Sequence, residues 1–387
     1  MSSEGKTPLS IPKQPLDILL PFPKQSPNGH TIEFLRQLVK EILAKDEVYS
    51  VTYSPILCPV SKEDGGGNNQ LFTIKPHWWR NPNGEWEWRD GQRNPENARP
   101  QGQAQLESVS KTIHTLALGI RHVPDPDLKQ KSIERIEKLL RVFFVDIHTR
   151  MEPQVRFSQC HPGQEPMKGN ECFVIAIRYL ILVNQALLLS GSSIKQDLVQ
   201  QVKEWINEQV VWMEESDQGM KAKNAEKPLW YNVILASHRQ FIQGNTSSIT
   251  LATASFNEWF TKHPLPQDVF AESLRHDNKR HKCLFTLEPL FMLASLTVPL
   301  HHEQGISDVI QKYLGECVEY VKDVEQGPIE SPSEDDIRYM ARVAWFERIL
   351  YGWNGQGERD ADGKEEPSGE GWENGWSARM RVMWGFI

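Results

Sequence analysis

Hydrophobic residues recur along most of this chain at intervals of three and four positions, the period of a helix with one buried face. One such face combines Ile133, Ile136, Leu139, Leu140, Phe143 and Phe144. A second face combines Ile306, Val309, Ile310, Tyr313, Leu314, Cys317 and Val321. Similar faces occur near residues 32–44, 103–121, 194–213, 229–243, 284–298 and 334–351. The pattern predicts an all-α fold of middling-length helices in antiparallel pairs, joined by Pro/Gly-rich loops.

One predicted helix differs from the others because it is apolar on nearly all sides. It covers residues 173–189, and only Arg178, Asn184 and Gln185 interrupt it. These 17 residues are few for a membrane span. We therefore expect an inner helix enclosed by other helices, and no membrane partner. Strand signals are sparse, and the best is Tyr49–Tyr53, where Val and Tyr alternate.

Composition divides the chain into four parts. Residues 1–28 are rich in proline and predict an extended leader. Residues 29–353 carry the helical pattern and predict one domain. Residues 354–373 combine acidic residues with glycine, which predicts a solvated surface loop. Residues 374–387 form an aromatic tail that we expect to pack on the domain.

The overall composition excludes several classes of protein. The chain has 387 residues, of which 39% are hydrophobic and 24% charged, and its net charge is −8. This acidity argues against a nucleic-acid binder, although a local basic cleft can still attract an anionic ligand. The five cysteines are scattered without a C-x-x-C pair, so neither a zinc ribbon nor a disulfide framework is indicated. The N-terminus lacks the pattern of a signal peptide, which predicts a cytoplasmic protein. No metal-ligand cluster is recognisable, and we expect a monomer without metal or cofactor.

Two neighbouring segments are unusually rich in tryptophan and arginine. The first reads Lys75-Pro76-His77-Trp78-Trp79-Arg80-Asn81-Pro82, and the second reads Trp88-Arg89-Asp90-Gly91-Gln92-Arg93-Asn94-Pro95-Glu96. Paired tryptophans followed by turn residues make a poor helix and a poor strand. Indole faces can stack on the apolar face of a sugar ring, and arginines can hold a carboxylate. The alternative is a loop whose tryptophans pack against the edge of the core.

Three later blocks follow this pair in a fixed order. Asp146-Ile147-His148-Thr149-Arg150-Met151-Glu152-Pro153 precedes Arg156-Phe157-Ser158-Gln159; Leu229-Trp230-Tyr231 comes next, and Arg275 through Leu290 comes last. Order and spacing resemble the alginate lyase superfamily of polysaccharide lyases over about residues 50–300. Members carry Tyr-Trp-Trp-Pro with Arg-Asp-Gly, then Asp-x-x-Thr-Arg-Met-Asn-Pro, then Asn-Asn-His before Trp-Tyr, and an Arg-rich segment that leads through His-Tyr to Phe-x-Leu.

The resemblance implies an (α/α) toroid, an incomplete barrel of antiparallel helix pairs, that cleaves an acidic polysaccharide by β-elimination. The proton on C5 of a uronic acid becomes acidic only when its carboxylate is neutralised, so the site needs cationic or hydrogen-bonding groups aimed at that carboxylate. A second group must take the proton and supply one to the leaving oxygen, a role that the family gives mostly to tyrosine.

The chain departs from the family pattern at the catalytic positions. Glu226-Lys227 stands where the family has Asn-His, and Lys282, preceded by His281, stands where it has the catalytic tyrosine. The family's arginine, seven residues earlier, is matched by Arg275, and its glutamine by Gln159.

These matches give each candidate residue an expected role. We expect Trp78 and Trp79 to stack on a ring, while Arg89, Gln159 and Arg275 hold the carboxylate with help from Lys227. Lys282, with His281 or Tyr231, is expected to move the proton. Like-charge repulsion among neighbouring cations favours the neutral form of a lysine, which can then act as a base. Further substrate-binding candidates are Arg150, Arg156, Glu226 and Trp230.

Three interpretations of the altered site remain open. The site is rebuilt around lysine and still eliminates on a uronate polymer; or it only binds acidic sugars; or it acts on a small acidic substrate inside the cell. The expected partner is accordingly an acidic carbohydrate or a small acid.

Overall fold

The computed structural model describes residues 29–90, 92–95, 97, 102–225, 228–276, 279–304, 307–324, 343 and 346. The predicted leader, acidic loop and aromatic tail lie outside these residues, as do Glu226 and Lys227. The longer helices are α1 (Gly29–Lys45), α2 (Gly102–His122), α3 (Pro126–Leu140), α5 (Leu180–Ser190), α6 (Gln196–Glu215), α8 (Leu229–Gln243), α9 (Asn245–Lys262), α11 (Lys279–Gln304) and α12 (Ser307–Lys322). Shorter elements are α4 (Phe173–Ile177), α7 (Asp217–Lys223), α10 (Pro266–Phe270), β1 (Trp78–Arg80) and β2 (Trp86–Trp88).

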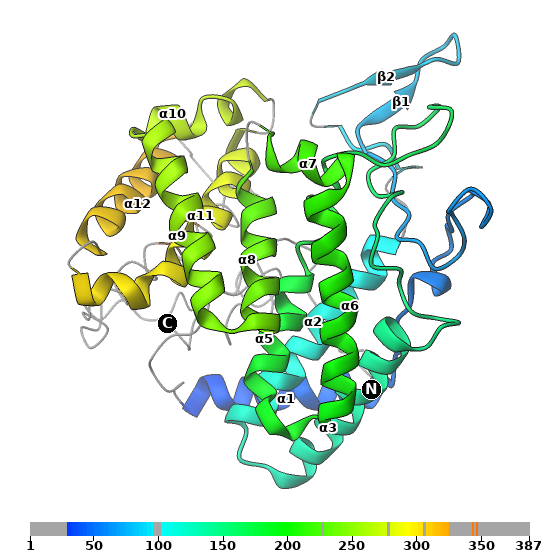
Figure 1. Cartoon of the computed structure of the whole chain (residues 1–387), viewed down its shortest axis with the longest axis vertical. Helices are drawn as coiled ribbons and strands as arrows, with labels where there is room; N and C mark the ends of the chain where they lie inside the picture. Colours follow the sequence, from blue (N-terminus) through cyan, green and yellow to red (C-terminus); the bar gives the residue numbers. More distant parts are fainter. Residues whose placement is uncertain are drawn as a thin grey trace, which may run out of the picture.

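The helices form two layers, as Figure 1 shows. In the inner layer, α2 packs on α5, α5 on α8, and α8 on α11. In the outer layer, α3 packs on α2, α6 on α8, α9 on both α8 and α11, and α12 on α11. The consecutive helices α2 and α3, α8 and α9, and α11 and α12 thus pair across the layers. The all-α fold class predicted from the hydrophobic period is confirmed.

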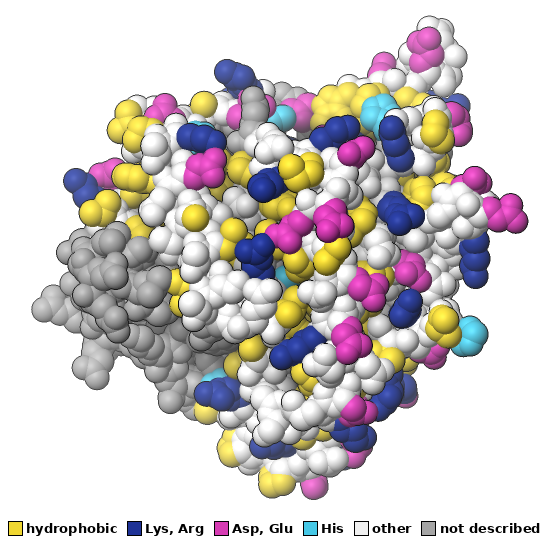
Figure 2. Space-filling model, viewed as in Figure 1, with side chains coloured by type: hydrophobic (Ala, Val, Ile, Leu, Met, Phe, Trp, Pro, Cys, Tyr) yellow, Lys and Arg dark blue, Asp and Glu magenta, His cyan; other side chains and the backbone are white. Residues whose placement is uncertain are grey.

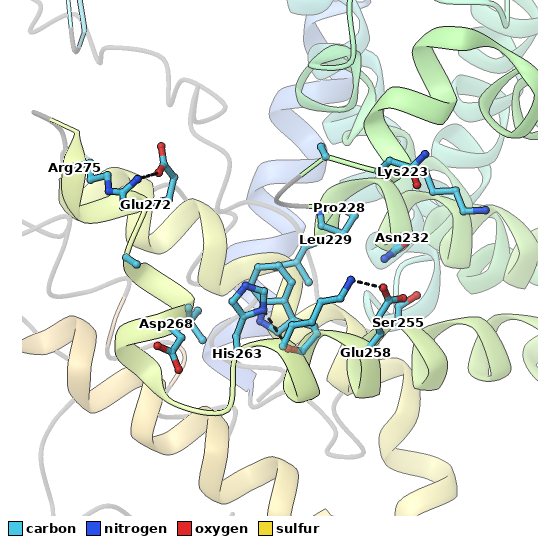
Figure 3. Close-up of a pocket in the computed structure, with 16 residues that line it drawn as sticks. Lys223, Pro228, Leu229, Asn232, Ser255, Glu258, His263, Asp268, Glu272 and Arg275 are labelled. Carbon is cyan, nitrogen blue, oxygen red and sulfur yellow. Dashed lines mark hydrogen bonds and ion pairs between the residues drawn. The ribbon is translucent and has the colours of Figure 1, made fainter.

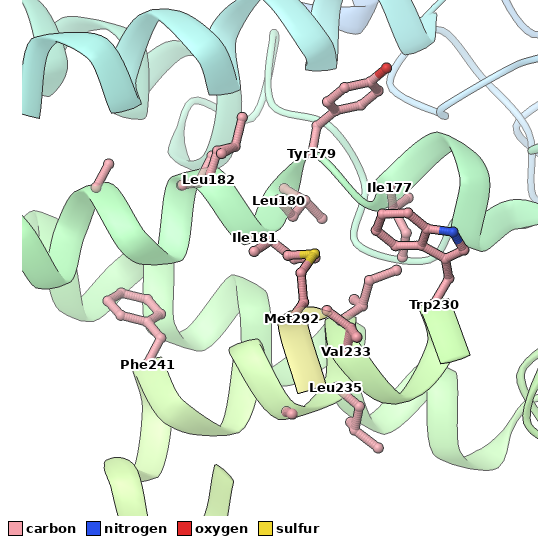
Figure 4. Packing of buried hydrophobic residues seen from close by; sticks show 14 of the residues in the cluster. Ile177, Tyr179, Leu180, Ile181, Leu182, Trp230, Val233, Leu235, Phe241 and Met292 are labelled. Atoms are coloured by element: carbon pink, nitrogen blue, oxygen red, sulfur yellow. The ribbon is translucent and has the colours of Figure 1, made fainter. Parts of the chain in front are cut away.

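The core lies between the inner helices and is built from large apolar side chains. Helix α5 contributes Leu180, Ile181 and Leu182, and α8 and α11 meet it with residues such as Val233 and Met292 (Figure 4), all buried. The segment Phe173–Ser193 is long and apolar enough to cross a membrane, but it is mostly buried inside the protein. It is therefore part of the core, as the sequence predicted.

Two local predictions were wrong. The predicted helix 173–189 is divided into α4 and α5. At the break Arg178 is buried, and its guanidinium donates to the carbonyl of Ile175 and to the hydroxyl of Tyr179. The predicted strand Tyr49–Tyr53 is instead a 3-10 turn, because the side chain of Ser50 accepts from the backbone N–H of Thr52 and caps it.

A hairpin that the sequence analysis did not expect lies at one end of the helix array. Strands β1 and β2 pair antiparallel and project from the body, at the end that also carries α7 and α10 (Figure 1). The turn forms because Asn81 accepts through its side chain from the backbone of Asn83 and Glu85, while Gly84 adopts φ 84°. Of the predicted helix 334–351, only Val343 and Phe346 are described, and both are buried.

Candidate functional site

The paired tryptophans lie on the hairpin. Trp78 pairs with Trp88 across the strands, and their rings meet edge to face at 5.9 Å. On its other side Trp78 contacts His161, with ring centroids 3.7 Å apart. The amide side chains of Asn94 and Asn97 both donate to the carbonyl of Trp78, at 2.8 and 2.9 Å. These contacts hold Trp78 between the hairpin and the loop that contains His161.

Trp79 and Arg89 lie together, as expected for a sugar-binding surface. The guanidinium of Arg89 lies over the Trp79 ring at 5.1 Å and also pairs with Glu87. The Trp79 indole N–H donates to the carbonyl of Gln92 at 3.2 Å. Trp78 and Trp79 are both partly exposed to solvent. Figure 2 shows hydrophobic, histidine and basic side chains gathered along the edge from which the hairpin projects.

Gln159 is fixed in an unusual backbone conformation beside the start of α2. It has φ 58°, which non-glycine residues rarely adopt, and it is 6% exposed. Its backbone N–H donates to the Thr73 hydroxyl at 2.6 Å, and its amide group lies 3.5 Å from that of Gln103. The next residue, Cys160, accepts from the backbone of Lys75 at 3.0 Å. Gln159 is therefore connected directly to the segment that leads into the hairpin.

Lys282 lies in the first turn of α11, close to residues of two other segments. Its charge helps to lower the pKa of His77, which burial lowers first. Its charge and that of Lys75 also act on Cys172, whose thiol pKa is nevertheless raised because burial disfavours the thiolate. We call Lys75, His77, Cys172 and Lys282 the Lys282 cluster. The charge of Lys282 therefore acts on the residue that immediately precedes Trp78.

His281 and Trp230 both contact Phe285 of helix α11. The His281 ring stacks on Phe285 at 6.2 Å, and the Trp230 indole donates to the Phe285 carbonyl at 3.1 Å. Trp230 is 4% exposed and lies beside the buried guanidinium of Arg178. Because its ring is used in the core, Trp230 cannot offer a stacking face to substrate, and its predicted binding role does not fit.

Tyr231 does not fit the predicted role in proton transfer. It is 1% exposed, and its hydroxyl donates to the carbonyl of Met213 at the end of α6, at 3.0 Å. Burial raises its pKa to about 12. A phenol that is buried and already bonded to the outer helix layer is not available to a substrate, so the correction follows from packing.

Arg275 lies at a separate cavity of about 480 Å³ between α8, α9 and α10. Arg275 and Glu272 form an ion pair of 3.2 Å on one side of this cavity, with Lys223 and Asn232 on the other (Figure 3). The next residue, His276, pairs with Asp90 beyond the hairpin at 3.0 Å. Among the described residues, no hydrogen bond or ion pair joins the Arg275 side chain to the Lys282 cluster, although the short helix Ser273–Arg275 packs against α11. Ala225 and Pro228, which flank Glu226 and Lys227, also line the cavity.

Arg150 and Arg156 lie in the loops that follow α3. Arg150 is half-buried, 4.0 Å from Glu152. Arg156 is exposed, with its guanidinium beside Gly65. Neither side chain forms a hydrogen bond or ion pair with the Lys282 cluster among the described residues, so both binding roles stay predictions. Within the same part of the chain, no group of three His, Cys, Asp or Glu side chains could hold a metal ion.

Comparison with known proteins points to one family. Residues 59–240 match the family model described as Alginate lyase. The crystal structure of an alginate lyase from Bacteroides ovatus resembles this chain with a TM-score of 0.71 and 20% sequence identity, over 84% of this chain and 86% of that one. No curated protein matches. The predicted family resemblance is thus confirmed over this segment, and the structural likeness establishes the fold.

Proposed function

We propose that this protein, which carries a segment matching the alginate lyase family, cleaves a uronate-containing polysaccharide by β-elimination at the Lys282 cluster. A polysaccharide-lyase-like function follows from the family and fold. The observation that carries the finer proposal is that the charge of Lys282, at the family's tyrosine position, acts on His77, the residue immediately before strand β1 of the tryptophan hairpin. Aromatic faces and cations then meet at one place, as an acidic sugar requires.

The reaction places two demands on these residues. Removing the C5 proton leaves negative charge beside the carboxylate, and cationic or amide groups must stabilise it. Lys75 and Gln159 are the candidates, because the backbone beside Gln159 bonds directly to that of Lys75. The C5–H electrons form the C4–C5 double bond as the C4–O bond breaks. The leaving oxygen then needs a proton, which we assign to the Lys282 ammonium.

Ultraviolet absorbance of the unsaturated uronate product tests this proposal. Incubation with alginate, glucuronan and hyaluronan should produce the absorbance with at least one polymer. Lys282→Met should lower the rate at least about 10²-fold, the usual contribution of a general acid or base. Lys312→Met, which changes an exposed lysine on α12, should leave the rate unchanged.

The same assay separates the alternatives. Flat absorbance with polymers that still retard the protein on an affinity gel would favour a binding module and refute elimination. A small acidic substrate is the second candidate, because the cavity beside Arg275 has the size of small-molecule sites, which run from about 300 to 1,000 Å³. Turnover of a short uronate or another small acid that depends on Arg275 but not on Lys282 would favour that function.

A further inference from the structure

His77 is held in one orientation by contacts on several sides. Its Nδ1 lies 3.0 Å from the carbonyl oxygen of Gln92, and its ring meets Trp88 edge to face at 5.0 Å. Its own carbonyl accepts from the backbone N–H of Arg89 at 2.9 Å. A carbonyl oxygen only accepts hydrogen bonds, so Nδ1 must carry the proton in this arrangement. The other ring nitrogen, Nε2, then presents a lone pair.

The charge of Lys282 acts on the ring that carries this lone pair. No hydrogen bond or ion pair to His77 Nε2 is formed by the described residues. Burial lowers the pKa of His77 below the ordinary value of 6.5, and the charges of Lys282 and Arg93 lower it further, although the hydrogen bond to the Gln92 carbonyl and the charge of Asp90 oppose them. The neutral form is therefore favoured at neutral pH, where a histidine can accept a proton.

Other groups near the cluster are less suited to accept a proton. The Cys172 thiol stays protonated, because burial raises its pKa. Asp90 is engaged with His276 at 3.0 Å. His161 shares the Nδ1 arrangement of His77, 3.3 Å from the carbonyl of Pro162, but its ring packs more closely against a neighbour, with its centroid 3.7 Å from that of Trp78.

We propose that His77 is the catalytic base, taking the C5 proton of the uronate on Nε2 while the Lys282 ammonium protonates the leaving oxygen. This inference rests on the proposed elimination and divides its two proton transfers between two residues. The imidazolium formed on His77 returns its proton to water, and the neutral Lys282 amine takes one from water. The cycle is balanced and needs no further reactant.

His77→Asn is the informative substitution. The asparagine amide can still donate to the Gln92 carbonyl, so the local anchor is kept, but the Nε2 lone pair is lost. We expect kcat to fall by about 10²- to 10⁴-fold with little change in KM, the range for loss of a general base. The matched control is His148→Gln, which changes an exposed histidine after α3 and should retain full activity.

The pH profile distinguishes a base from a structural role. In the wild type, kcat/KM should fall at acid pH with a pKa below 6.5, because protonation of His77 removes the base. That acid limb should be missing from the residual activity of His77→Asn. Near-wild-type activity in this variant, or an unchanged acid limb, would overturn the inference while leaving the proposed function intact. A wild type without elimination on any uronate polymer would overturn both.

A measurement on the wild type does not depend on how the variants fold. Nitrogen-resolved NMR of the imidazole should show His77 neutral at pH 7, protonated on Nδ1, and perturbed by a saturated uronate oligomer. A proton on Nε2 of the neutral ring, or a charged ring at that pH, would contradict the assignment.

Discussion

Buried polar side chains connect α5, α6 and α8. His238 is fully buried; its Nδ1 lies 2.8 Å from the amide nitrogen of Asn184 and its Nε2 2.9 Å from the amide oxygen of Gln209. The ring must therefore accept at Nδ1 and donate from Nε2. Gln209 in turn donates to the carbonyl of Pro153, after the Asp-x-x-Thr-Arg-Met block. The network ties that block to the helix layers.

This network predicts a pH dependence of stability. Burial lowers the pKa of His238 to about 3, whereas the unfolded chain titrates near 6.5. The unfolded state therefore binds the proton more readily, and stability present above 6.5 is lost as the pH falls. We expect the free energy of unfolding to decrease by about 2 kcal/mol from this group between about pH 7.5 and about pH 5.

Urea denaturation of the wild type and His238→Gln at both pH values measures this contribution. The variant should be less stable at neutral pH, by about 1–3 kcal/mol for disturbed buried hydrogen bonds, but should have a smaller pH dependence. His122, whose pKa burial lowers to about 4, titrates with the same sign in both proteins, so the difference isolates His238. Equal pH dependence in the two proteins would refute the assignment.

At the scale of elements, the hairpin depends on a close approach to the loop that follows Gln159. Gly163 has φ 76°, and a Cβ there would lie 2.5 Å from the Trp86 ring. Arg80 covers the same ring at 4.8 Å. The loop therefore fixes the far strand at Trp86, as it fixes the near strand through His161 and Trp78. The aromatic surface is set by two elements together.

Two glycine substitutions separate backbone strain from this contact. Gly84→Ala and Gly163→Ala both place a side chain at positive φ, which costs about 1–2 kcal/mol. Only Gly163→Ala also collides with Trp86, since no atom lies within 4 Å of a Cβ at Gly84. We expect Gly163→Ala to change tryptophan fluorescence and weaken binding of uronate oligomers more than Gly84→Ala does. Equal affinities would show that the loop does not position the binding surface.

At the scale of the whole molecule, the net charge is −8, while the charges of two lysines of the Lys282 cluster, Lys75 and Lys282, both act on Cys172. Cys172 immediately precedes α4, and Lys282 lies in the first turn of α11. Helix N-termini carry partial positive charge. At the site we propose, these local positive charges would attract an acidic polymer, whereas the overall negative charge would repel it.

Salt decides which charge dominates binding. Raising the salt concentration from about 0.1 M to about 1 M shortens the Debye length from roughly 10 Å to roughly 3 Å. If the local cations dominate, as we expect, calorimetry should show that the affinity for a uronate oligomer falls. An affinity that rises with salt would mean that screening of the overall negative charge matters more, against the proposed site.

The helical period alone determined the all-α fold, because burial of one face forces apolar residues to recur every three to four positions. The enclosed helix 173–189 was recognisable because it is apolar on nearly all sides, although its break at Arg178 was not. The motif order also pointed to the family whose model matches residues 59–240. These properties depend on residues close together in the chain, or on types at fixed spacing.

Local capping and contacts between distant segments decided the rest. Tyr49–Tyr53 alternates like a strand, yet the side chain of Ser50 makes it a turn. Tyr231 and Trp230 are chemically suitable for a site, but helix packing buries them. The sequence alone gives His77 no role. Its tautomer depends on the carbonyl of Gln92, and its protonation state depends in part on the charge of Lys282. The types of residue available are written in the sequence; which of them meet, and in which protonation state, depends on packing and burial.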